Sequence, residues 1–382
     1  MEGEILSLGK NSSPHLHLPS ELSSFKAFPH MLDPVNQIRM GLSENPLGCS
    51  PKAIDAIFKQ LNSAHRYPDA SGTSLVEKIA DYTGLKRENV IVGNGIDELL
   101  LFIALTFLGR NGAAAVSDST YSGHAGAVVA VKASGVYVPL SQDAGKYFVD
   151  VASMAKCLID NDVVFLCNPH NPTGTAIDRE QLDELVTAAE RGGSLLVVDE
   201  AYMEFAEPDL SISAIEHVRA DRPVIVLRTF SKAYGLAGLR CGYALAPAIY
   251  TEQLYRIKNV TVYNVNRYAL AAAEASLEDL DFLESVTRHN RKVMQDFLDE
   301  ITEFPWLDSY LSAANFLFCR LPWPADYISK ELQNQGVLVR SCSDLGFPYH
   351  LRISVGTRDE MVRLKDALSV TAKNFMAAGD IL

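Results

Sequence analysis

Residues 224–240 read VIVLRTFSKAYGLAGLR, a short apolar run followed by a loop of small residues that carries Lys232. The run of Val, Ile and Leu has the length and composition of a buried strand. A lysine directly after such a strand can lose solvent, which lowers the pKa of its amine and makes it a Schiff-base nucleophile. Arg240 follows closely enough to share an anion such as a phosphate with Ser231. The competing interpretation of Lys232 is a solvated loop lysine.

Four more apolar runs of this kind precede residue 224, and amphipathic helical patterns such as 97–108 and 179–191 lie between them. This alternation predicts βαβ units, which build a mostly parallel sheet covered by helices on both faces. Such sheets bind ligands at the carboxyl ends of their strands, so the polar residues after each run are candidate site residues. The four runs are Val90–Val92, Ala113–Val116, Val163–Leu166 and Leu195–Val198.

The pattern changes near residue 266, where long helices at 269–277 and 278–301 are expected. Strands are expected at 316–319, 337–340 and 351–355, with a last helix at 358–375. The first forty or so residues contain several prolines and are expected to be irregular. We therefore predict an N-terminal segment, 1–45, that packs on a smaller domain or on a partner, a large α/β domain, 46–265, and a smaller α+β domain, 266–382.

The composition excludes several classes of protein. The net charge of −13 and the lack of a Lys/Arg run argue against a nucleic-acid partner. Six cysteines without a Cys-x-x-Cys pair indicate reduced thiols, with neither a disulfide framework nor a metal site. The N-terminus lacks the pattern of a secretory signal, and the longest apolar run, Leu99–Leu108, is too short to span a membrane. These features favour a cytoplasmic protein without a membrane partner.

Three loops after predicted strands carry further polar residues. Residues 94–98 open a helix after a strand and offer free backbone N–H groups to an anion. Residues 168–174 form a proline-rich loop that can aim an asparagine side chain, or simply a structural turn. Residues 199–202 place acids after an apolar strand, as in an ATPase. The chain lacks the glycine-rich Gly-x-x-x-x-Gly-Lys-[Ser/Thr] loop that an ATPase needs, so that interpretation fails.

Taken together, these loops resemble the pyridoxal-phosphate (PLP)-dependent fold-type I aminotransferases, and among them the histidinol-phosphate aminotransferase-like branch. The resemblance runs from about residue 42 to 356 and implies the aspartate-aminotransferase-like fold. The motifs that carry it are SENPLG (43–48), RYPD (66–69), NPTG (171–174), DEAYMEF (199–205), SK (231–232) and LRISVG (351–356).

The resemblance also implies roles for the residues of a cofactor site. Lys232 holds PLP as a Schiff base and then moves the substrate α-proton. Asp199 pairs with the pyridine nitrogen, while Asn171 and Tyr202 hydrogen-bond the phenolic oxygen. Tyr121 stacks on the ring. Lys232, Asp199 and Tyr202 are the residues implied to be catalytic.

Further residues are implied to bind the cofactor phosphate and the substrate. The phosphate lies among Gly95, Ile96, Asp97, Ser231 and Arg240. In this family a tyrosine of the partner subunit completes the phosphate site, and Tyr67 matches it, which implies a homodimer with shared active sites. Arg352 matches the arginine that grips the acidic group of the substrate, and Asn45 faces the substrate.

The sequence departs from the branch mostly around the substrate, where Ser43, Ser119 and Val262 replace the usual Asn, Pro and Pro, and Ile96 replaces a small residue near the phosphate. Three hypotheses therefore stand. The first is an aminotransferase that moves an amino group between an amino acid or a histidinol-phosphate-like donor and a 2-oxo acid. The second is a PLP-dependent lyase, decarboxylase or β/γ-replacement enzyme. The third is a non-catalytic protein that retains the fold, which the presence of Lys232 and Asp199 disfavours.

Overall fold

The computed structural model describes residues 37–109, 111–207 and 212–377, and its core is a seven-stranded sheet. Six of the strands run in one direction, as predicted for a mostly parallel sheet. Five of these six begin at the residue expected, whereas the edge strand at 134–138 was not predicted. Strand β10 is antiparallel to both of its neighbours. In spatial order the strands are β2 (Val90–Gly93), β10 (Gly242–Leu245), β9 (Val224–Thr229), β8 (Leu195–Asp199), β7 (Val163–Cys167), β3 (Ala113–Ser117) and β4 (Ser134–Val138).

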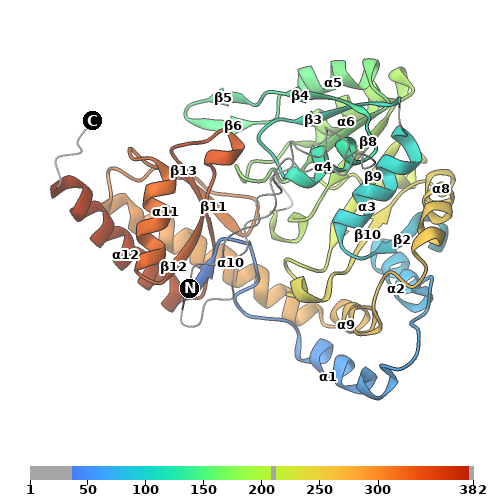
Figure 1. Ribbon diagram of the computed structural model, residues 1–382, viewed down its shortest axis with the longest axis horizontal. Coiled ribbons are helices and arrows are strands. Elements are labelled where there is room, and N and C mark those ends of the chain that lie inside the picture. The colour runs from blue at the N-terminus through green and yellow to red at the C-terminus, as the bar shows by residue number, and fades with distance from the viewer. Residues whose placement is uncertain (1–36, 110, 208–211, 378–382) are drawn as a thin grey trace, which may run out of the picture. The chain divides into compact units, whose positions relative to one another are not determined.

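Helices cover both faces of this sheet, as Figure 1 shows. Successive residues of β7 point to opposite faces, so Val164 and Leu166 belong to one buried cluster and Val163 and Phe165 to the other. The first face is covered by α2 (Thr73–Thr83), α5 (Val151–Asp160), α6 (Arg179–Gly192) and α9 (Arg267–Leu277), with α1 (Pro51–Gln60) packed on α9. The second is covered by α3 (Ile96–Ile103), α4 (Ser122–Ala130) and α8 (Ala248–Lys258).

A four-stranded sheet forms a second core with its own helices. Its strands, in spatial order, are β1 (Ile38–Met40), β12 (Val337–Ser341), β13 (His350–Ser354) and β11 (Phe316–Arg320). Helices α11 (Ala325–Asn334) and α12 (Arg358–Ala377) pack against it. The three strands expected near the C-terminal end of the chain are confirmed within a residue or two.

Strand β1 corrects the prediction that the first forty or so residues are irregular. It pairs in parallel with β12 at the edge of the four-stranded sheet. A run of only three residues is too short to show the alternation by which strands are recognised in a sequence. The rest of the predicted N-terminal segment before Gln37 lies outside the described residues.

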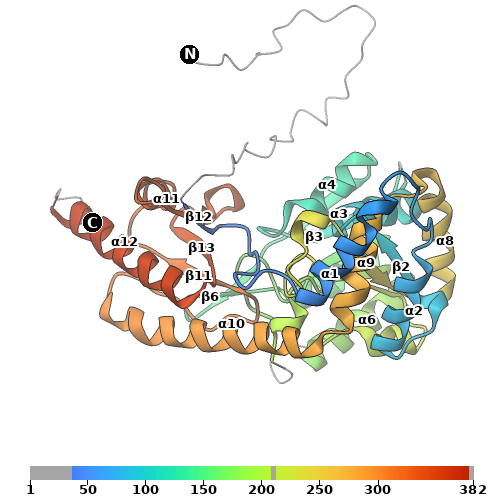
Figure 2. The same cartoon turned by 90° about the horizontal axis from the view of Figure 1, so that it is seen from below.

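Helix α10 (Leu280–Glu300) joins the two cores. Val286, near its start, is buried with the side chains of the seven-stranded sheet, whereas Val293, Met294 and Phe297 are buried with those of the four-stranded sheet. The helix is the long orange ribbon labelled in Figure 2. One continuous helix therefore contributes to both hydrophobic cores.

Two smaller elements complete the description. A hairpin of β5 (Ser141–Asp143) and β6 (Lys146–Phe148) follows β4, and the short helix α7 (Ile215–Arg219) precedes β9. Among the helices in the described part of the chain, none is both long enough and apolar enough to cross a bilayer.

Candidate active site

Lys232 follows the end of β9 in the loop predicted from its sequence. Its Nζ donates a hydrogen bond to the carbonyl oxygen of Leu42 at 2.8 Å. Burial of the amine, assisted by the positive charge of Arg352, lowers the pKa of Lys232 to about 8. An amine with this pKa is partly neutral near neutral pH, so it can act as a nucleophile or a base.

Asp199 ends β8 and is buried, and its carboxylate has two partners. The backbone N–H of Ala201 donates to Oδ1 at 3.1 Å, and the ring of His124 contacts Oδ2 through Nε2 at 2.9 Å. His124 lies on α4, stacked at 5.9 Å on Phe165 of β7. Sequence reasoning missed His124, because a lone histidine in an apolar helix carries no motif. It fixes the orientation of the buried carboxylate.

Asn171, Tyr202 and Arg352 form a connected polar group beside Lys232. Arg352 on β13 donates to Asn171 Oδ1 at 2.6 Å and to the carbonyl oxygen of Gly41 at 2.7 Å. Asn171 Nδ2 in turn lies 3.5 Å from the Tyr202 hydroxyl. Burial raises the pKa of Tyr202 to about 12, so the phenol keeps its proton. The Arg352 Nε is buried without a hydrogen-bond partner among the described residues. This leaves an N–H group for a ligand.

Arg240 lies against the turn that begins α3. Its guanidinium donates to Ser231 Oγ at 3.3 Å and to Asp97 Oδ2 at 3.0 Å. A Cβ atom on Gly95, where φ is +84°, would lie 2.7 Å from the Arg240 guanidinium, so only glycine fits this approach. The side chain of Ile96 is buried, and its backbone N–H lies in the first turn of α3, where helix N–H groups can face an anion. The arrangement is a cationic cradle at a helix N-terminus.

Tyr121 stands between this cradle and a cavity of about 260 Å³. Its hydroxyl hydrogen-bonds Asp97, and burial together with that carboxylate raises the pKa of the phenol. The cavity is also lined by Ser119, Thr120, Asp344 and Gly346, so it brings the loop after β3 to the loop between β12 and β13.

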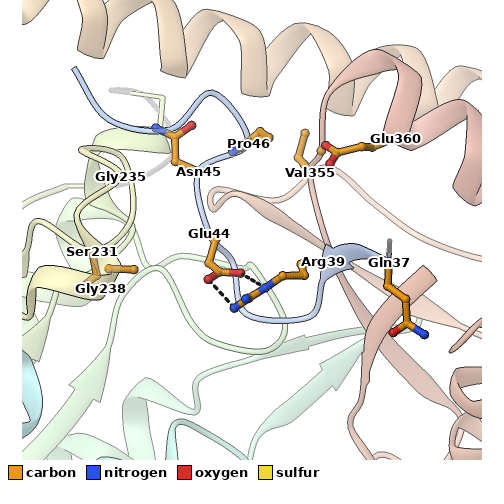
Figure 3. Close-up of a pocket in the computed structure, with 12 residues that line it drawn as sticks. Gln37, Arg39, Glu44, Asn45, Pro46, Ser231, Gly235, Gly238, Val355 and Glu360 are labelled. Carbon is orange, nitrogen blue, oxygen red and sulfur yellow. Dashed lines mark hydrogen bonds and ion pairs between the residues drawn. The ribbon is translucent and has the colours of Figure 1, made fainter. Parts of the chain in front are cut away.

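A second cavity, of about 420 Å³, lies between the loop that carries Lys232 and the segment that follows β1. Figure 3 shows the ion pair of Arg39 and Glu44 that lines it, with an Nη2–Oε1 distance of 2.8 Å. Asn45 also lines this cavity, but its amide donates to the carbonyl oxygen of Ala233 at 2.9 Å and accepts from the backbone of Leu47 at 3.0 Å. The Asn45 side chain therefore anchors the loop to the segment after Lys232.

Tyr67 stands apart from the other predicted site residues. Its side chain is 78% exposed and stacks on Tyr263, with ring centroids 4.7 Å apart. Within the described part of the chain, the Tyr67 hydroxyl makes no hydrogen bond to Arg240 or Ser231 of the cradle. Two aromatic rings stacked at the surface form an apolar patch of the kind that is covered in an assembly.

Arg340 is a second arginine beside Arg352 that sequence reasoning did not single out. It lies directly opposite Arg352 in the antiparallel pairing of β12 with β13. Opposed residues of antiparallel strands point to the same face of the sheet, so the two guanidinium groups emerge from one face. Each of the two strands carries one arginine, and only the strand register identifies them as a pair.

Comparison with known proteins gives consistent results. Residues 35–368 match the family model described as aminotransferase class I and II. Histidinol-phosphate aminotransferase 2 of Pseudomonas fluorescens is 35% identical over 97% of this chain and 98% of its own length. Histidinol-phosphate aminotransferase of Brevibacillus brevis is 34% identical over 87% of this chain and 89% of its own. A crystal structure of histidinol-phosphate aminotransferase from Sinorhizobium meliloti in complex with pyridoxal-5'-phosphate superposes with a TM-score of 0.82, at 27% identity over 97% of this chain and 99% of that one. The chain therefore belongs to the class I and II aminotransferases.

Proposed function

We propose that this PLP-dependent aminotransferase takes its amino group from a donor that carries a phosphate, histidinol phosphate or a close relative, and passes it to a 2-oxo acid. The observation that carries the proposal is the pairing of Arg340 with Arg352 across β12 and β13. Two guanidinium groups on one face suit a doubly charged phosphate better than a single carboxylate. The names of the relatives that are about one third identical point to the same donor.

The residues present fit the cofactor. PLP has an aldehyde, a ring nitrogen, a phenolic oxygen and a phosphate, and each has a complementary group here. Lys232 has a buried amine of lowered pKa, and Asp199 is a buried carboxylate that can pair with a protonated ring nitrogen. The cradle of Ser231, Arg240 and the first turn of α3 suits the phosphate. When bound, PLP supplies an electron sink for the bonds broken at the substrate Cα atom.

Within this proposal each residue of the chain has a separate task. Lys232 holds the cofactor, and its Nζ later moves the proton of the substrate Cα atom. Asp199, oriented by His124, keeps the ring nitrogen protonated. Asn171 and the Tyr202 hydroxyl hydrogen-bond the phenolic oxygen, and Tyr121 covers the ring. Arg352, with its free Nε–H, and Arg340 hold the phosphate of the donor.

We also infer a homodimer in which Tyr67 of one chain completes the phosphate cradle of the other. The exposed stack of Tyr67 on Tyr263 supports this arrangement, as do exposed apolar side chains in the same part of the sequence, Phe58, Leu61, Val260 and Val262. We further propose the division of the chain near residues 45 and 265, and a cytoplasmic location, which the six free cysteines support.

A comparison of histidinol phosphate with histidinol tests the donor. The two compounds differ only in the phosphate, so the arginine pair predicts that the phosphate ester converts the bound cofactor to its amine form at least about a hundredfold more efficiently, because two charge-assisted hydrogen bonds are lost with histidinol. The measurement is the visible absorbance of the holoenzyme during a single half-reaction. Equal efficiency of the two donors would show that the donor carries no phosphate. Release of ammonia or of carbon dioxide would instead favour elimination or decarboxylation.

A further inference from the structure

Arg340 and Arg352 both lie next to Gly41, but their side chains have different surroundings. Gly41 lies beside the main chain of Arg340, since a Cβ atom on Gly41 would be 3.7 Å from the Arg340 backbone nitrogen. The Gly41 carbonyl oxygen accepts a hydrogen bond from the Arg352 side chain. Arg352 is buried, and Asn171 holds it. The Arg340 side chain is 36% exposed. Of the two, Arg340 is the one with room to move.

The partner of Arg340 is a carboxylate that lines a cavity. Asp344 Oδ2 accepts a hydrogen bond from Arg340 Nη2 at 2.5 Å. Asp344 also lines the cavity of about 260 Å³ that contains Tyr121 and Ser119. Thr120 lines the same cavity, and its hydroxyl donates a hydrogen bond to the carbonyl oxygen of Asn171 at 3.1 Å. The side chain of Asn171 in turn accepts a hydrogen bond from Arg352. A negative charge therefore stands beside the arginine pair.

We propose that Asp344 is a specificity-determining residue that holds Arg340 when the bound substrate carries a single negative charge and releases it to a doubly charged phosphate. This inference rests on the proposed function, in which the arginine pair binds the donor phosphate. An aminotransferase binds donor and acceptor in turn at one site, and here their charges differ. With Arg340 on Asp344, one guanidinium faces the carboxylate of a 2-oxo acid. With Arg340 released, two face the phosphate.

The ion pair of Arg340 with Asp344 is weak enough for a phosphate to replace Asp344. Both side chains are partly exposed, and pairs of this kind change an equilibrium constant by no more than about fivefold. A phosphate that offers two charged oxygens to Arg340 can therefore displace Asp344. The displaced carboxylate still repels a dianion more strongly than a monoanion, because Coulomb energy is proportional to charge. Asp344 thus weakens the binding of phosphate more than that of carboxylate and brings the two substrates closer in affinity.

Titration of the Asp344→Asn holoenzyme tests the proposal. The probes are inorganic phosphate, mostly dianionic at pH 8, and acetate, each followed by isothermal titration calorimetry with PLP bound so that the cofactor's own phosphate site is filled. We expect the Kd for phosphate to fall about fivefold and that for acetate by no more than about twofold. Glu252→Gln is the matched control, because it removes one negative charge from a similar i,i+4 pair with Arg256 on α8.

Variants of Arg340 separate this inference from the proposed function. In Arg340→Gln we expect phosphate binding to weaken by at least about tenfold. In the double variant we expect Asp344→Asn to give a smaller gain than it gives alone, because only the repulsion by the carboxylate is then relieved. If Arg340→Gln weakens phosphate binding but Asp344→Asn changes nothing, or changes phosphate and acetate equally, the role of Asp344 is wrong while the arginine pair stands. If Arg340→Gln leaves phosphate binding unchanged, the arginine pair itself is wrong.

Discussion

At the scale of single residues, Lys232 differs from an ordinary lysine because burial lowers its pKa to about 8. Below that pH the amine is protonated and cannot attack an aldehyde, and above it the neutral form prevails. We therefore predict that the rate of PLP uptake by the cofactor-free protein rises through a midpoint near pH 8. The measurement is the absorbance of the lysine-bound cofactor after mixing. Free PLP with N-acetyl-lysine serves as the control, and a midpoint shared with that control would contradict the shift.

His124 supports a second prediction at this scale. It gives the buried Asp199 carboxylate a hydrogen bond of 2.9 Å. Hydrogen bonds to charged groups contribute about 1.5–3 kcal/mol, so His124→Asn should weaken PLP binding by roughly tenfold to a hundredfold while the fold persists. An absorbance titration with PLP measures the affinity, and circular dichroism checks the fold. His289→Asn, a change on α10 at a histidine whose Nε2 hydrogen-bonds the Gly356 carbonyl oxygen at 3.0 Å, should leave the affinity unchanged. Equal effects of both variants would mean that His124 is merely structural.

Single site residues could be predicted from the sequence where they belong to a motif. Lys232, Asp199, Asn171, Tyr202 and Arg352 sit in motifs, and the structure brings them together around one site. His124 and Arg340 do not sit in motifs. Their importance arises from packing in the case of His124 and from strand register in the case of Arg340. Neither property is visible in a single sequence.

At the scale of elements, the start of α3 carries the third prediction. Gly95→Ala places a methyl group 2.7 Å from the Arg240 guanidinium and strains a φ of +84°. We expect a loss of about 1–2 kcal/mol in the free energy of unfolding from the backbone alone, and in addition at least about tenfold weaker PLP binding because Arg240 is displaced. Urea denaturation and absorbance titration measure the two effects.

Gly193→Ala separates these contributions. Gly193 ends α6 with a φ of +65°, and a Cβ atom there would meet nothing within 4 Å. The variant should show the backbone cost without loss of PLP affinity. If both glycine variants bind PLP equally, the contact with Arg240 has no role in the cradle.

Elements were predictable where they were long or fully buried. The parallel strands around β7 and β8 are continuous apolar runs, and α6 and α10 have clear amphipathic periods. Strand β10 was not predicted, because Gly-Tyr-Ala-Leu lacks β-branched residues, and its four residues form a strand through pairing on both sides. Tertiary context determined that element.

At the scale of the whole molecule, the proposed homodimer with shared active sites predicts complementation between two inactive variants. Lys232→Ala lacks the amine proposed to hold the cofactor, and Tyr67→Ala lacks the residue proposed to enter the site of the partner. In a hybrid dimer one site has neither residue and the other has both. Random reassociation of an equal mixture should restore about a quarter of the sites. Activity after mixing is the readout, with each variant alone as the control. Failure to recover activity in hybrids verified by mass spectrometry would place Tyr67 outside the partner's site.

The arrangement of α10 has a mechanical consequence. With 21 residues at 1.5 Å each, the helix is about 30 Å long. Its first turns are embedded in one core and its last turns in the other. A change of about 5° in its tilt would therefore move the far end by about 2.6 Å over that length. The bond between Arg352 and Asn171 is 2.6 Å long and reaches from one sheet to the loops of the other. Repacking of a single side chain near Val286 would thus change the distance between Asn171 and Arg352, the arginine that we propose to bind the substrate.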